Sequence, residues 1–276
     1  MKNNTEKEVV YVAELDADVD DVVAAEYLHN KGVLKCVVLD PLPKTEQGKS
    51  RKKALEDLGI TVVNKLPNIS KYVFIGGALT QVAQYIKTRH IDVLVMNGGF
   101  VGSNIVPITE QLNKFREKET VRTFNFNCDV QAASAVLKST EQQIGKILLV
   151  GKNVCHSIIN TELGIWNDAE SKALFKKYNV KEDKRQHDML ACHEGLAYLG
   201  LGGVTVPYTT RLVVRPFNLG LKGNMTEWGS LKEDEKSPYR TVVASICFPE
   251  KIKEKYKNIK EPKRDNKRRS YNKKNK

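Results

Sequence analysis

Short apolar runs alternate with helical patterns along most of this chain, and this alternation limits the fold more than any other feature. The runs occupy residues 9–13, 34–39, 72–75, 93–96, 147–150 and 241–248, and the helical patterns lie at 22–29, 49–58, 79–88, 130–139, 169–177 and 188–200. This order is typical of right-handed βαβ units around a parallel sheet. We therefore predict an α/β fold with a mostly parallel central sheet flanked by helices. Its end is expected to be antiparallel, because no clear helix separates 205–216 from 241–248.

The charge of the chain is concentrated at its C-terminal end. The net charge is +12 over 276 residues, and residues 250–276 hold 13 Lys or Arg against 4 Asp or Glu, which is +9. No Ser/Pro-rich linker divides the preceding sequence. We predict one α/β domain at 1–249 and a basic, disordered tail at 250–276. The tail is a candidate for weak, salt-sensitive contact with nucleic acid, or a solubilising appendage.

Composition excludes several classes of protein. No apolar run is long enough to span a membrane, and residues 1–8 lack the apolar stretch of a signal peptide. The five cysteines are widely spaced and form no CxxC pair. Reduced thiols in a cytoplasmic protein are therefore expected rather than a disulfide framework.

The segment 14–21 carries five carboxylates within eight residues, directly after the apolar run 9–13 and before the helical pattern at 22–29. It therefore lies where a strand ends and a helix begins, the edge of a parallel sheet at which ligand sites gather. Carboxylates this close repel one another, and a hard cation such as calcium or magnesium offsets that repulsion through oxygen ligands. We predict a metal site here. The alternative is a solvated acidic loop with one Asp as a helix N-cap.

The acidic segment also resembles the N-terminal signature of the inosine-uridine-preferring nucleoside hydrolases, Asp-x-Asp-Pro-Gly-x-Asp-Asp-Ala-x-Ala. Asp16, Asp20 and Asp21 match three of its aspartates, Glu14 replaces the first, and residues 17–18 replace its Pro-Gly pair. Further patches follow in the family's order between residues 9 and 248. The resemblance implies the nucleoside hydrolase fold and a divergent member of that family.

Three of these patches lie in the middle of the chain. Residues 76–83 are similar to the family's Gly-Pro-Leu-Thr-Asn-Ile-Ala, in which the Thr carbonyl ligates calcium, and Thr80 is the matching residue. Residues 93–100 resemble a strand that ends in Met-Gly-Gly, and Asn104 falls near a substrate-binding Asn. Residues 124–133 resemble a segment in which an Asn holds the sugar, and Asn125 matches that Asn.

The last patch resembles the family's His-Asp-Pro-Leu-Ala at the start of a helix, where the Asp ligates calcium and the His assists the leaving base. Residues 187–191 match it, and residues 193–197 offer a rival alignment six residues later. We choose Asp188, because this alignment keeps both the aspartate and the helix-start position. His187 is then the expected active-site histidine, with His193 as the alternative.

The resemblance implies a calcium-dependent hydrolysis of the N-glycosidic bond of a ribonucleoside or a related ribosyl compound. It implies calcium ligation by Asp16, Asp21, Asp188 and the Thr80 carbonyl. Asp20, beside the activated water, is the candidate general base. Asn104 and Asn125 are expected to bind the ribose, and His187 to assist departure of the base. The family is commonly oligomeric, so a homo-oligomer is also implied.

Departures from the family pattern favour a second interpretation. The family carries a Gly-Asn that reaches the substrate, and residues 40–48 contain no equivalent Asn; the family's Glu two residues before the sugar-binding Asn is Thr123 here. A catalytically weak homologue that binds a nucleoside or nucleotide is therefore the alternative, and the basic tail makes association with nucleic acid a third hypothesis.

Overall fold

The fold is described from a computed structural model of the chain. It describes residues 8–157, 169–180, 186–203, 209–220, 226–232 and 237–247. The predicted tail at 250–276, the last residue of the run 241–248, and residues 205–208 of the run 205–216 lie outside the described residues.

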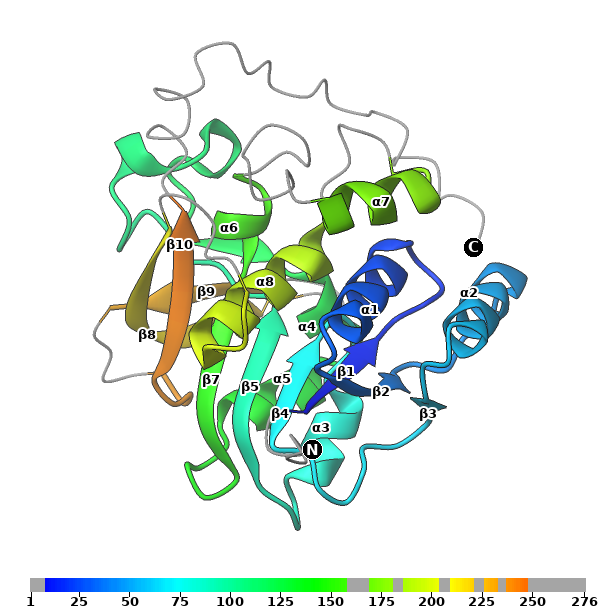
Figure 1. The fold of residues 1–276 in the computed structure, drawn as a ribbon. Helices are drawn as coiled ribbons and strands as arrows, with labels where there is room; N and C mark the ends of the chain where they lie inside the picture. The colour runs from blue at the N-terminus through cyan, green and yellow to red at the C-terminus, as the bar shows by residue number, and fades with distance from the viewer. Residues whose placement is uncertain are drawn as a thin grey trace, which may run out of the picture.

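The strands form one ten-stranded sheet in the order β3-β2-β1-β4-β5-β7-β10-β8-β9-β6 (Figure 1). All pairs from β3 to β10 are parallel, and the pairs β10–β8, β8–β9 and β9–β6 are antiparallel. The mostly parallel sheet and its antiparallel end are therefore confirmed. The strands are β1 Val9–Ala13, β2 Leu34–Leu39, β3 Val62–Val63, β4 Tyr72–Ile75, β5 Ile91–Asn97, β6 Thr120–Arg122, β7 Ile144–Val150, β8 Thr209–Gly220, β9 Thr226–Leu231 and β10 Val242–Cys247.

Helices cover both faces of the parallel part, as predicted (Figure 1). Helices α1, α7 and α8 pack on one face and α3 and α5 on the other. The α-helices are α1 Asp20–Asn30, α2 Glu46–Asp57, α3 Thr80–Tyr85, α4 Phe124–Cys128, α5 Val130–Leu137, α6 Lys152–Cys155, α7 Ala169–Lys177 and α8 His187–Leu199, and the 3-10 helices are Ile108–Glu110 and Asn113–Phe115.

Strand β1 shows why the sheet needs both layers. Its five residues are all buried, and alternate side chains enter the two separate cores. Tyr11 points into the core beneath α1 and α8, whereas Val10 and Val12 point into the core beneath α3 and α5. Because residues along a strand alternate between faces, a strand buried on both sides reads as a continuous apolar run.

The parallel register brings several strand ends to one edge. Val12 on β1 lies opposite Ile75, the last residue of β4, and Asn97, the last residue of β5, lies opposite Val150 at the end of β7. The loops that follow these strands therefore start side by side. This is the edge at which open parallel sheets bind ligands.

Two predictions from composition can be compared with the described residues. None of the five cysteines forms a disulfide. In the described part of the chain, no helix is both long enough and apolar enough to cross a lipid bilayer.

Candidate metal centre and adjoining cavity

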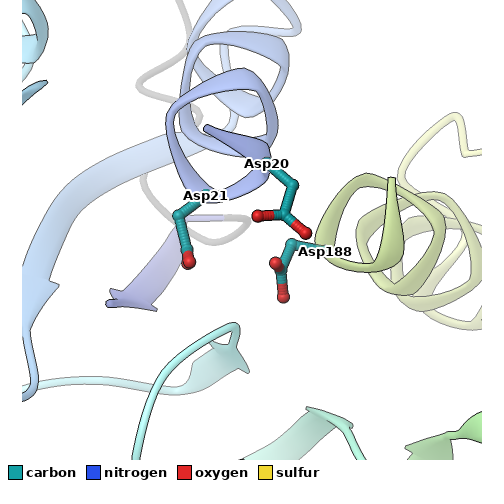
Figure 2. Close-up of side chains that lie close together, drawn as sticks. All are labelled: Asp20, Asp21 and Asp188. Carbon is teal, nitrogen blue, oxygen red and sulfur yellow. The ribbon is translucent and has the colours of Figure 1, made fainter. Parts of the chain in front are cut away.

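Three buried aspartates meet at the carboxyl edge of the sheet. Asp20 and Asp21 occupy the first turn of α1, and Asp188 occupies the first turn of α8. One carboxylate oxygen from each lies within 4.8 Å of the others. Figure 2 shows the three side chains converging from the two helices. We call these three residues the aspartate triad.

Neutral groups hold Asp21 in place. The Tyr11 hydroxyl, from β1, donates to Asp21 Oδ1 at 2.7 Å, and the backbone N–H of Glu14 donates to the same carboxylate. Gly76 leaves the space this pair needs, because a Cβ at that position would lie 2.1 Å from the Tyr11 hydroxyl and 2.3 Å from Asp21 Oδ1. The acidic turn is therefore packed against the end of β4 with no room for a larger residue.

Asp188 is held from the opposite side by β5. The side-chain amide of Asn97 donates to Asp188 Oδ1 at 2.7 Å. The same residue accepts, through its backbone carbonyl, a 2.9 Å hydrogen bond from Asn125. Asn97 therefore joins a triad aspartate to one of the predicted sugar-binding residues.

Two of the triad aspartates have raised pKa values. Burial raises the pKa of Asp21 well above its usual range, and the charge of Asp20 raises it further. Burial likewise raises the pKa of Asp188, with added contributions from Asp21 and Asp20. In the described part of the chain, no lysine or arginine forms an ion pair with Asp21 or Asp188.

This donor set fits a hard divalent cation. Carboxylate oxygens are the ligands that calcium and magnesium prefer, and an ion among them would offset the repulsion that raises both pKa values. The family resemblance predicted Asp21 and Asp188 as calcium ligands and Asp20 as the general base. The structure brings all three residues together.

Asp16, the other predicted carboxylate ligand, faces the start of α2. Its carboxylate accepts hydrogen bonds from the backbone N–H groups of Lys44 and Thr45, and from the Thr45 hydroxyl at 2.8 Å. Burial alone would raise its pKa, but these hydrogen bonds outweigh it and the pKa lies below the usual range. Asp16 is therefore ionised, and it is not among the three residues that converge.

Thr80, the predicted carbonyl ligand, begins α3, which follows β4. Its hydroxyl donates to Asp129 Oδ2 at 2.9 Å, and Asp129 caps α5 through the Ala132 N–H. The adjoining N–H of Gln81 donates to the buried carboxylate of Asp40 at 2.7 Å. Helices α3 and α5 thus begin next to each other at this edge of the sheet.

A cavity of about 450 Å³ lies between the acidic loop and these helix starts. Its walls combine carboxylates with apolar groups, and its size is within the range of small-molecule sites. The residues that line it are Glu14, Asp16, Ala17, Asp40, Pro41, Ala78, Thr80, Phe124, Cys128 and Asp129. Glu14 connects the cavity to the triad, because its backbone N–H binds Asp21 while its carboxylate accepts from the N–H groups of Asp16 and Ala17.

The two predicted sugar-binding asparagines have different surroundings. Asn125 is buried on α4 and bonded to Asn97, which places it one residue from the triad. Asn104 is exposed, and its amide donates to the carbonyl of Ser230 on β9 at 3.3 Å. The structure therefore links Asn125, but not Asn104, to the triad through hydrogen bonds of the described residues.

The two candidate histidines on α8 also differ. His193 is buried, stacks on the Tyr27 ring at 4.5 Å, and lies 3.3 Å from the Tyr27 hydroxyl through Nδ1. His187 is half-buried beside Asp188, with its ring 5.0 Å from that of His156. His193 thus contributes to packing between α8 and α1, whereas His187 lies next to the triad residue Asp188.

Sequence reasoning missed Tyr11, Asn97 and Gly76. Tyr11 reads as one more residue of a buried strand, and its hydroxyl was the only signal of a polar role. Asn97 is a polar residue at the end of an apolar strand, which at this edge of a parallel sheet indicates a ligand-side position. That signal was available in the sequence.

Comparisons with known proteins agree with this geometry at the level of the fold. No protein-family model matches the chain. An uncharacterized protein of Aquifex aeolicus (strain VF5) is 27% identical over 168 residues, which cover 57% of this chain and 54% of that protein. The chain therefore spans about half the length of this relative.

Two solved structures are similar to most of the chain. A plant nucleoside hydrolase, PpNRh1, gives a TM-score of 0.52 at 12% identity, covering 89% of this chain and 96% of its own. The inosine-uridine preferring nucleoside hydrolase from Bacillus anthracis gives 0.54 at 15% identity, covering 87% and 94%. These values confirm the fold that the motifs predicted.

Proposed function

We propose that this protein is a calcium-dependent N-ribohydrolase that cleaves the glycosidic bond of a ribonucleoside or a related ribosyl compound. One observation carries the proposal. Three buried carboxylates, with no lysine or arginine paired to Asp21 or Asp188 among the described residues, converge at the ligand-binding edge of a nucleoside hydrolase-like fold.

Asp21 and Asp188 are the proposed calcium ligands from the triad. The sequence resemblance adds the Thr80 carbonyl and Asp16, which flank the adjoining cavity. When bound, calcium supplies a Lewis acid that lowers the pKa of a coordinated water and attracts sugar hydroxyls. Asn125 and Asn104 are the proposed hydrogen-bond partners of the ribose.

Asp20 is the proposed general base. It removes a proton from water as the water oxygen bonds to the anomeric carbon and the carbon–nitrogen bond breaks. His187 donates a proton or a hydrogen bond to the departing base nitrogen, so that one water is added across the bond. Positive charge that develops on the sugar, as in other glycoside hydrolyses, is stabilised by the neighbouring carboxylates.

The first experiment measures calcium binding by calorimetry and then, in the same sample, release of free base from a panel of nucleosides. Asp188→Ala is expected to lose both calcium binding and turnover. Asp20→Ala is expected to lose turnover while keeping most of the calcium binding. The matched control is Asp57→Ala, an exposed aspartate at the end of α2, which is expected to change neither quantity. Intact turnover in Asp20→Ala would remove Asp20 as the base.

A second candidate function has a specific observation in its favour. Asp16 is ionised and bonded to the start of α2 rather than converging with the triad. A nucleoside-binding homologue with little turnover would fit a weaker cation site. Calcium and nucleoside binding without base release is the result that selects this candidate.

Two predictions from the sequence concern surfaces outside the site. Homo-oligomerisation would be measured by sedimentation of the purified protein. Nucleic-acid contact through residues 250–276 would be measured by comparing the full chain with a chain ending at residue 249. If the tail carries that contact, its removal abolishes binding and flattens the salt dependence.

A further inference from the structure

We propose that Asn97 is a positioning residue that couples the cation site to the ribosyl site. The inference rests on the proposed function, since it assigns a role between two of that function's parts. Asn97 is the last residue of β5, with its backbone in parallel register with Val150 at the end of β7. It is therefore part of the rigid sheet rather than of a loop.

The Asn97 side chain acts on the cation side. Its amide nitrogen donates to Asp188 Oδ1 at 2.7 Å, and Asp188 also has a carboxylate oxygen within 4.8 Å of those of Asp20 and Asp21. Partners that orient a carboxylate in this way affect the affinity for a metal without touching it.

A second contact bears on the orientation of the amide. The thiol of Cys155, on α6, lies 3.8 Å from Asn97 Oδ1, and it is also 3.7 Å from the Val150 carbonyl and 3.8 Å from the His187 carbonyl. Burial raises the pKa of the Cys155 thiol far above its usual range, so it remains protonated and can donate. With a donor at Oδ1, the amide nitrogen is the atom that faces Asp188.

The Asn97 backbone acts on the sugar side. Its carbonyl accepts from Asn125 Nδ2 at 2.9 Å, which restrains the amide plane of Asn125. One residue thus determines the position of Asp188 through its side chain and of Asn125 through its main chain. A shift of Asp188 on cation binding would therefore reach Asn125 through a single residue, Asn97.

The test compares wild type with Asn97→Leu, which keeps the approximate volume and removes the donor. Calcium affinity is measured by calorimetry, and KM and kcat by release of base from inosine. Asn97→Leu is expected to weaken calcium binding about 10- to 100-fold, the range for loss of an outer partner of a metal ligand. It is also expected to raise KM, because the main chain at residue 97, whose carbonyl is kept and holds Asn125, loses its side-chain anchor on Asp188.

Asn125→Ala is the control that separates coupling from general damage. It is expected to raise KM and leave calcium affinity unchanged, whereas Asn97→Leu changes both. If Asn97→Leu does not fold, Asn97→Ser, whose hydroxyl is too short to reach Asp188, replaces it with the same expected result.

The outcomes are distinguishable from failure of the proposed function. Calcium binding by wild type together with unchanged affinity in Asn97→Leu overturns the inference alone. Weakened calcium binding with an unchanged KM overturns the coupling. Absence of calcium binding by wild type overturns the proposed function, and this inference with it.

Discussion

Helix α1 carries buried carboxylates at two places, and their surroundings differ in charge. Glu26, in the second half of the helix, is 7% exposed and binds Lys177 Nζ through both oxygens, at 2.7 and 2.8 Å, and also the Tyr178 hydroxyl. Asp21, in the first turn, is 4% exposed and is bonded only to neutral donors among its described contacts. One carboxylate has a cation from the protein and the other has none.

The same contrast holds on α8. Glu194 is fully buried and pairs with Arg211 at 3.2 Å, whereas Asp188, six residues earlier, is bonded to Asn97 and Asp20. Burying a charge without a partner is costly, so natural proteins provide one. The chain supplies cations to Glu26 and Glu194 but, among the described residues, none to Asp21 or Asp188, which is what the proposed site for an ion from solution requires.

The largest expected effect comes from removing one charge of the triad. Asp188→Asn is expected to weaken calcium binding by about two orders of magnitude, because ligand charge count tunes calcium affinity over several orders of magnitude. Glu26→Gln, the matched change on the same kind of buried carboxylate, is expected to leave calcium affinity unchanged. Calorimetric titration of both variants measures the difference, and equal losses would break the comparison.

Steric crowding gives the next largest effect. Gly76→Ala places a methyl group 2.1 Å from the Tyr11 hydroxyl and 2.3 Å from Asp21 Oδ1, and overpacking of this kind costs about 1–3 kcal/mol of unfolding free energy. We expect weaker calcium binding as well, because Asp21 must move. Thermal unfolding and calorimetry measure the two effects.

Gly48→Ala is the companion variant for Asp16. Its methyl group would lie 2.1 Å from Asp16 Oδ1, so it displaces Asp16 rather than Asp21. If Asp16 ligates calcium as the sequence predicts, this variant also binds calcium more weakly. An unchanged affinity in Gly48→Ala would assign Asp16 to the start of α2 alone.

Replacing a carboxylate by its amide is expected to change the unfolding free energy in opposite directions at the two sites. With calcium removed by a chelator, Asp21→Asn is expected to stabilise the protein by about 1 kcal/mol. The change relieves the repulsion between residue 21 and the neighbouring carboxylates, while the amide oxygen still accepts from Tyr11. Glu26→Gln is expected to destabilise it by about 1 kcal/mol, reduced by the exposure of Lys177. Denaturant unfolding measures both, and the same sign for the two variants would contradict our account.

The smallest expected effect is on the pH dependence of stability. The pKa values of Asp21 and Asp188 are raised in the folded protein, so the folded state holds more protons than the unfolded state above about pH 4. The stability of the metal-free protein is therefore expected to fall as the pH rises from about 4 toward neutrality. Saturating calcium should abolish this slope, and thermal unfolding across pH with calcium or chelator measures it.

Most helices and strands were predicted from the local pattern of apolar and turn residues. Strands β1, β2 and β4 and helix α7 have the predicted bounds, because apolar runs between turn residues indicate strands directly. Helix α2 begins at Glu46 rather than 49, since Thr45 caps it by accepting from Gly48 N–H. Helix α3 ends at Tyr85, short of the predicted 88. Element ends depend on such caps, which the apolar pattern does not contain.

The sequence by itself determined the fold class and the acidic turn after β1, because strand burial and charge spacing are local properties, and its resemblance to nucleoside hydrolases indicated the candidate aspartates. Only the tertiary structure decided which carboxylates meet. Asp188 reaches Asp20 and Asp21 because α8 packs beside α1, while Asp16, nearer in sequence, is drawn away by the N–H groups at the start of α2. Asn97 joins the site because the parallel register ends β5 at the same edge. Distances between residues far apart in sequence are fixed by packing and register, and no local pattern records them.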